Sequence, residues 1–109
     1  MVNLLRFKDR ATGADEGVTG AEAYRRYAEA VAPFLARAGG RLLAAVECEE
    51  SVIGPDTAEW DLVALVEYPS REAFLAMISD REYLAAHAHR VAAVADSRLV
   101  LSTPVTPPD

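Results

Sequence analysis

The stretch Trp60-Asp61-Leu62-Val63-Ala64-Leu65-Val66-Glu67-Tyr68 is the most strand-like part of the chain. Its apolar run from Leu62 to Val66 occupies both side-chain directions, because successive residues of a strand point to opposite faces of the sheet. A strand that is apolar on both faces is typical of the middle of a sheet that is covered on both sides. We therefore expect residues 60–68 to form an inner strand, which Pro69-Ser70 ends.

The segments around this strand predict the order β-α-β-β-α-α-β. Two stretches, Thr19-Gly20-Ala21-Glu22 and Ser79-Asp80-Arg81-Glu82, have the spacing of capping boxes and predict the starts of the two longer helices. Ser70 is the expected cap of a short helix between them, and Asp96-Ser97 the expected end of the last helix, near residue 95. Strands are predicted at 2–7, 41–48, 60–68 and 98–102, with a loop over 49–59.

This order predicts an α+β, ferredoxin-like βαββαβ fold in which the second helix is split. Its four-stranded sheet is antiparallel and its helices lie on one face only. The other face needs a cover because the central strand is apolar on both sides, and a second copy of the chain is the simplest cover. We therefore expect a homodimer, with one domain over residues 1–102 and a proline-rich tail over 103–109.

Composition excludes several classes of partner. The chain has 109 residues and a formal net charge of −6, which disfavours binding to nucleic acid or to anionic lipid. No apolar run approaches the roughly 20 residues that span a bilayer, and no signal peptide is visible at the start, so a cytoplasmic location is expected. Cys48 is the only cysteine, and an inert buried thiol is expected there. The high content of Ala, Arg and Val is typical of GC-rich bacterial genes.

Several segments together resemble one known family. They are Met-Val-Asn-Leu-Leu-Arg-Phe-Lys at residues 1–8, Trp60-Asp61-Leu62-Val63, Val66 to Phe74, Ser79 to Tyr83, His89-Arg90 and Asp96 to Leu99. In this order they resemble the domain-of-unknown-function 1330 family. The resemblance implies a ferredoxin-like protomer in a dimeric α/β barrel, and it implies no reaction. The wider barrel superfamily includes cofactor-free monooxygenases, lactone isomerases, polyketide cyclases, haem enzymes and stress proteins, so activity cannot be carried over from the fold.

The two histidines are the first candidates for chemistry. On a helical wheel at about 100° per residue, His87 falls on an apolar stripe with Tyr83, Leu84, Val91 and Val94, and His89 lies about 200° away, facing outward. Residues i and i+2 of a helix do not face each other, so His87 and His89 do not predict one metal site. We expect neither a metal nor a cofactor; a haem on His87 is the alternative that the barrel relatives suggest.

His87, Glu67 and Arg90 are the predicted catalytic residues. A buried imidazole is more stable uncharged, so His87 can accept a proton, while Glu67 or Arg90 orients it or balances charge. The alternative for His87 is a core histidine with one hydrogen bond, and for Glu67 an ion pair with Arg41, Arg90 or Arg98. The predicted ligand-binding residues are Asn3, Tyr24, Tyr27, Trp60, Tyr68, Tyr83 and His89. Core packing is the alternative for the aromatic ones, and a solvated or interface position for His89.

Two functions remain open on these residues. The first is a cofactor-independent enzyme of isomerase, cyclase or monooxygenase type, acting on a small carbonyl or aromatic metabolite. The second is a non-catalytic dimeric binding or stress-response protein. A cavity with His87 pointing into it favours the first, and a filled core with a hydrogen-bonded His87 favours the second.

Overall fold

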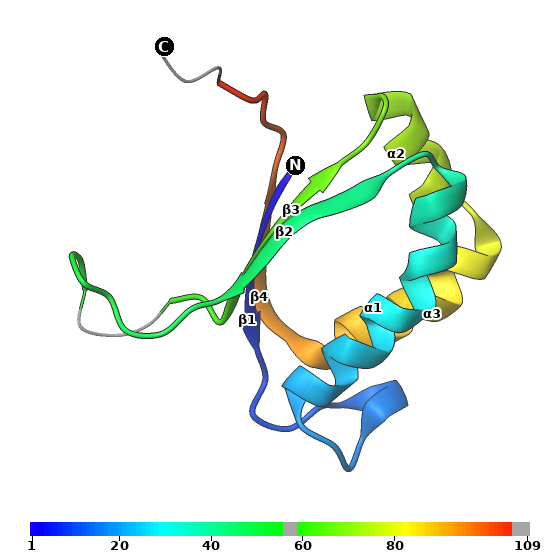
Figure 1. The fold of residues 1–109 in the computed structure, drawn as a ribbon. Helices are drawn as coiled ribbons and strands as arrows, with labels where there is room; N and C mark the ends of the chain where they lie inside the picture. The colour runs from blue at the N-terminus through cyan, green and yellow to red at the C-terminus, as the bar shows by residue number, and fades with distance from the viewer. Residues whose placement is uncertain (56–58, 106–109) are drawn as a thin grey trace.

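The computed structural model describes residues 1–55 and 59–105. The chain forms a four-stranded antiparallel sheet in the order β2-β3-β1-β4, with the helices on one side of it (Figure 1). This is the predicted ferredoxin-like α+β fold. The elements are β1 (Val2–Phe7), the 3-10 turn η1 (Gly13–Asp15), α1 (Gly20–Arg37), β2 (Arg41–Glu47), β3 (Leu62–Glu67), α2 (Arg71–Ile78), α3 (Arg81–Ala93) and β4 (Val94–Val100).

The strand β3 is an inner strand, as predicted, between β1 and β2. Its partners fix which residues share a face, because residues directly opposite each other in antiparallel strands point the same way. Asn3 lies opposite Ala64 on β3 and opposite Leu99 on β4, and these three face the helices. The other face carries an apolar set: Val2, Leu4, Val46, Val63, Leu65 and Val100.

The helix starts follow from side-chain caps. The hydroxyl of Thr19 accepts a hydrogen bond from the Glu22 amide, and that of Ser70 accepts one from the Ala73 amide, both as predicted. The predicted start of α3 was wrong by one residue. Asp80 is the cap, because its carboxylate reaches the Glu82 amide at 2.8 Å, while Ser79 closes α2.

The end of α3 also differs from the prediction. The helix ends at Ala93, and β4 begins at once with Val94, so Asp96-Ser97 lies inside the strand and breaks no helix. Pairing with β1 decides this, since Asp96 stands opposite Arg6 and Ser97 opposite Leu5. Ser97 therefore points to the helix side of the sheet, with Leu5, and Asp96 points to the other side, with Arg6.

The buried face of α3 differs from the predicted stripe. Tyr83, Ala86, Ala92 and Ala93 are buried, whereas Leu84 and Val91 are 54% and 58% exposed. The wheel placed His87 on a buried stripe with Leu84 and Val91, and the exposure of these two residues shows that this part of the stripe was wrong. His87 is half-buried and lies against the ring of Tyr83, with ring centroids 5.9 Å apart.

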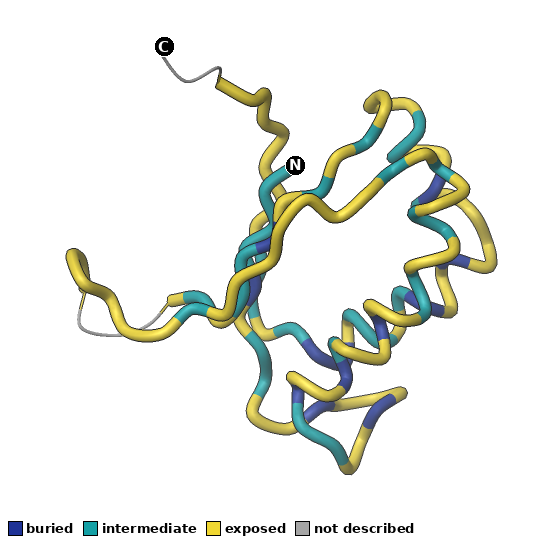
Figure 2. The backbone as a smooth tube through the Cα atoms, in the orientation of Figure 1, coloured by how far each residue is buried: buried dark blue, intermediate teal, exposed yellow. Residues whose placement is uncertain are grey.

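The helix layer joins the sheet chiefly at one end, where β1 ends, α1 begins and α3 runs into β4 (Figure 1). The Lys8 amide donates to the Ala93 carbonyl at 2.8 Å, and the Gly20 amide donates to the Lys8 carbonyl at 3.1 Å. Leu5, close to this junction, is completely buried. At the other end, α1 leads into β2 and β3 leads into α2, and the residues of β2 are exposed (Figure 2).

The loop and the tail hold no regular structure in their described parts. Residues 49–55 and 59 contain neither helix nor strand, and the same is true of residues 103–105. The remainder of the predicted loop, 56–58, and of the predicted proline-rich tail, 106–109, lies outside the described residues. No helix in the described ranges is long and apolar enough to cross a membrane.

Candidate functional site

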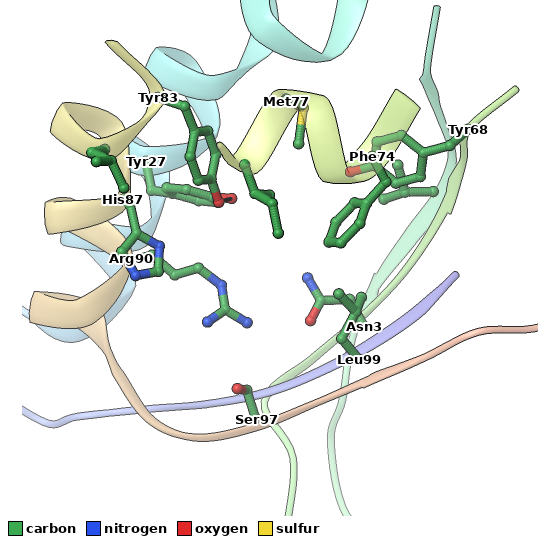
Figure 3. A pocket seen from close by; sticks show the side chains of 13 residues that line it. Asn3, Tyr27, Tyr68, Phe74, Met77, Tyr83, His87, Arg90, Ser97 and Leu99 are labelled. Carbon is green, nitrogen blue, oxygen red and sulfur yellow. Dashed lines mark hydrogen bonds between the residues drawn. The ribbon is translucent and has the colours of Figure 1, made fainter. Parts of the chain in front are cut away.

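A cavity of about 450 Å³ lies between the sheet and the helices. This volume is within the range of small-molecule sites. Most of its wall is apolar or aromatic, and a few polar side chains converge on it (Figure 3). The lining residues are Asn3, Tyr27, Val66, Tyr68, Phe74, Met77, Ile78, Tyr83, Leu84, His87, Arg90, Ser97 and Leu99.

Two polar atoms of this wall are buried without a partner. They are Nδ1 of His87 and Oδ1 of Asn3, and neither forms a hydrogen bond with any described residue. A buried polar atom without a hydrogen bond costs about 1–3 kcal/mol. The two side chains come from opposite walls of the cavity, His87 from α3 and Asn3 from β1 (Figure 3).

The tyrosines supply neutral hydrogen-bond donors. The hydroxyls of Tyr27 and Tyr83 lie 3.2 Å apart. Burial and this hydrogen bond hold the pKa of Tyr27 well above its usual range, and burial raises the pKa of Tyr68 to about 12. The hydroxyls of Tyr27 and Tyr68 therefore stay protonated at neutral pH. Tyr68 also packs edge-on against Phe74, with ring centroids 5.1 Å apart, and forms the apolar end of the cavity.

Four predicted site residues lie outside the cavity, and three of them are Glu67, Trp60 and Tyr24. Glu67 forms an ion pair with Arg41 at 2.9 Å, half-exposed at the end of β3. Trp60 lies under the guanidinium of Arg98, whose Cζ is 5.5 Å from the ring centroid. Tyr24 packs between Phe7 and Tyr27, behind the cavity wall, and burial raises its pKa.

His89, the fourth of these, belongs to a separate polar cluster. Its Nδ1 lies 2.7 Å from the carboxylate of Asp15, whose other oxygen accepts from Arg26, also at 2.7 Å. The Asp15 side chain has no exposed surface, and that of His89 is 31% exposed. The expectation that His89 simply faces outward was therefore wrong, because η1 folds over it. The cluster ties η1 to both α1 and α3.

The sequence and the structure of the chain both match known proteins. The model of the domain of unknown function DUF1330 matches residues 14–103. The chain belongs to the DUF1330 family. The crystal structure of RPA0582, a protein of unknown function from Rhodopseudomonas palustris, is 44% identical, with a TM-score of 0.88 over 97% of this chain and 81% of that one. The structure of methylated RPA0582 is 43% identical, with the same TM-score, over 99% and 81%. No curated protein gives a significant match.

The sequence did not lead us to Ser97 and Leu99 of the cavity or to Asp15 of the polar cluster. Ser97 and Leu99 line the cavity from β4, but the predicted break at Asp96-Ser97 hid Ser97. Strand alternation from Leu99 would have found it, because residues two apart share a face. Asp15 carried no local signal, since its partners Arg26 and His89 lie 11 and 74 residues further along the chain.

The described part of this DUF1330 chain contains no evident metal site. Among the residues described, no group of three or more His, Cys, Asp or Glu side chains is placed to hold a metal ion. His87 and His89 point to different surroundings, one to the cavity and the other to Asp15.

The Asp15 cluster gives a stability prediction. Asp15→Asn should lower the melting temperature at pH 7 by roughly 10 °C, because it removes an ionised acceptor of two short hydrogen bonds. Burial alone would raise the pKa of Asp15, but the bonds from Arg26 and His89 outweigh it and hold the pKa below the ordinary value of 3.8. A lowered folded-state pKa stabilises the protein above pH 3.8, and that contribution is lost as the pH falls through the folded-state value.

Thermal melts between pH 3 and 7 test this prediction. The gap between wild type and Asp15→Asn should narrow below about pH 4. Asp96→Asn is the matched control: its carboxylate is partly exposed and pairs with Arg98 and Arg6 on the surface, so it should change the melting temperature by only a few degrees. Equal effects of the two variants at pH 7 would contradict the structural role of Asp15.

Proposed function

We propose that this protein binds a small carbonyl-bearing or aromatic molecule in the cavity between sheet and helices. The observation that carries the proposal is the pair of buried, unpartnered polar atoms, His87 Nδ1 and Asn3 Oδ1, on facing walls of one cavity. In a tightly packed core, such buried polar atoms are hydrogen-bonded, or apolar side chains stand in their place. A ligand hydroxyl would donate a hydrogen bond to Asn3 Oδ1, and a ligand carbonyl would accept one from the Nδ1–H tautomer of His87. The flat body of the ligand would contact Tyr68 and Phe74.

The same residues support acid–base chemistry on such a ligand. His87 would take up and return a proton, while the hydroxyls of Tyr27 and Tyr83 would stabilise an oxyanion. Reactions of this kind are isomerisation and cyclisation, which need no cofactor. Glu67 has no part in this proposal, because it pairs with Arg41 outside the cavity.

A homodimer is part of the proposal. The sheet face opposite the helices carries Val46, Leu65 and Val100, which are 57%, 40% and 48% exposed. Val2, Leu4 and Val63 share that face. Apolar patches of this kind are typical of protein interfaces, and the equivalent face of a second copy would cover it.

His87→Leu tests the proposed site. The substitution removes the unpartnered nitrogen, so the melting temperature should stay within about 3 °C of wild type or rise. Binding of the neutral aromatic ketone 2-acetonaphthone, followed by its fluorescence, should weaken about tenfold or more, since the imidazole partner is lost.

His89→Gln is the matched control and should show the reverse pattern. It weakens the contact to Asp15, so stability should fall while affinity for 2-acetonaphthone stays within about twofold. A His87→Leu variant that binds as wild type does would remove His87 from the site. A large loss of stability in His87→Leu would instead identify a structural core histidine.

Catalysis and plain binding can be separated with the same ketone. In D₂O, proton NMR follows exchange of its methyl protons next to the carbonyl. Exchange that the wild type accelerates and His87→Leu does not would support an acid–base enzyme. Saturable binding without accelerated exchange would support the alternative, a non-catalytic binding or stress-response protein.

A further inference from the structure

Among the described residues, the cavity wall contains one formal charge, the guanidinium of Arg90. No Asp or Glu in residues 1–55 or 59–105 lines the cavity, although the chain has 17 acidic residues against 11 Lys and Arg. Arg90 forms no ion pair and no side-chain hydrogen bond with any residue in 1–55 or 59–105. Its guanidinium extends from α3 into the middle of the cavity, between His87, Asn3 and Ser97 (Figure 3). The pocket of an acidic protein is therefore locally positive.

Some other arginines of the chain have acidic partners, and the arginines that have none among the described residues lie outside the cavity, except for Arg90. Arg26 pairs with Asp15, Arg41 with Glu67, and Arg98 with Asp96. Arg90 cannot lose its charge to adapt to the cavity, because guanidinium stays protonated at any relevant pH. The neighbouring tyrosines do not neutralise it either, since burial raises the pKa values of Tyr24 and Tyr27 and keeps both uncharged.

The rest of the wall limits the kind of anion. Beyond Arg90 the cavity is lined by Tyr68, Phe74 and Leu99, which offer contact area to an apolar or aromatic body (Figure 3). One guanidinium with neutral donors on Ser97 and Asn3 suits a single carboxylate, which arginine binds through two parallel hydrogen bonds. A phosphate would bring more charge than one cation balances.

We infer that the cavity takes a small aromatic or apolar monoanion, a carboxylate or an enolate of similar shape, with Arg90 as its anchor. This inference rests on the proposed function and narrows its ligand class. Arg90 binds the charged end, His87 Nδ1 and Asn3 lie beside it, and the Tyr68 end holds the apolar body.

The test compares two probes of the same shape, 2-naphthoate and 2-naphthamide, by calorimetric titration at pH 7. Wild type should bind the carboxylate about 10- to 100-fold more tightly than the amide. Arg90→Gln should weaken binding of the carboxylate much more than binding of the amide, and should thereby remove that preference. Arg90→Lys should keep part of the preference, because lysine retains the charge without the planar fork. Arg81→Gln, an exposed substitution at the start of α3, should change neither affinity.

The outcomes separate this inference from the proposed function. If wild type binds both probes equally, or if a folded Arg90→Gln still prefers the carboxylate, the anion inference is overturned and the binding site stands. If neither probe binds wild type, the proposed function fails and the inference fails with it. The wild-type comparison decides the matter even where Arg90→Gln does not fold.

Discussion

Gly20→Ala should lower the unfolding free energy by about 3 kcal/mol or more, because a side chain at this position collides with backbone that cannot move aside. A Cβ at Gly20 would overlap the Lys8 carbonyl oxygen and stand 2.8 Å from that of Ala93. Both carbonyls hold the junction of β1, α1 and α3 through backbone hydrogen bonds. The melting temperature should fall by roughly 15 °C, which circular dichroism would measure.

Gly13→Ala is the control for this prediction. Gly13 has a φ of 55°, so alanine is strained there, but its Cβ would meet nothing within 4 Å. The cost should be about 1–2 kcal/mol, the ordinary penalty for a left-handed residue. If Gly20→Ala melts within a few degrees of wild type, the junction is looser than its hydrogen bonds indicate, and it would not hold the two walls of the cavity in place.

Leu65→Asp should convert the proposed dimer into a folded monomer. Leu65 lies on the outer face of β3 beside Val2 and Ala44, so a carboxylate there would be buried without a partner when two copies meet. Dimer affinity should fall about 100-fold or more. Sedimentation at micromolar concentration should give about twice the 11.8 kDa chain mass for wild type and the single mass for the variant.

Val52→Asp is the matched control, since Val52 is 94% exposed in the loop between β2 and β3. It adds the same charge away from the sheet face and should leave the dimer intact. A monomeric wild type, or a Leu65→Asp variant that stays dimeric, would exclude the outer sheet face as the interface.

The parts of the fold that local chemistry decides could be predicted from sequence. The run Leu62 to Val66 is apolar in both directions and indeed lies inside the sheet. Thr19 and Ser70 cap their helices because a hydroxyl at that position reaches the amide three residues on. Such signals need only a few neighbouring residues.

The phase of α3 could not be predicted in the same way. The helical wheel predicted that the large apolar residues Leu84 and Val91 are buried. In the structure these two are exposed, and the small residues Ala86 and Ala93 are buried. The helix packs through Tyr83 and its alanines, whereas Leu84 and Val91 remain exposed. Hydrophobicity alone does not distinguish a packed face from a face left open beside a cavity.

The site was only partly predictable for a related reason. Asn3, His87 and Arg90 attracted attention as polar residues in apolar segments, and the structure brings all three to the cavity. Glu67 and His89 had the same kind of signal, but each has a partner distant in sequence, Arg41 and Asp15. Which polar residue is satisfied by the protein and which is left for a ligand depends on tertiary contacts.

Amide chemical-shift mapping during a titration with 2-naphthoate tests the central claim most directly. If the sheet–helix cavity is the binding site, the largest saturable shifts should fall on residues of its opposite walls, Asn3 on β1, Ser97 and Leu99 on β4, and His87 and Arg90 on α3. Shifts confined to the outer face of the sheet around Leu65 and Val100, or no saturable shifts at all, would contradict the account.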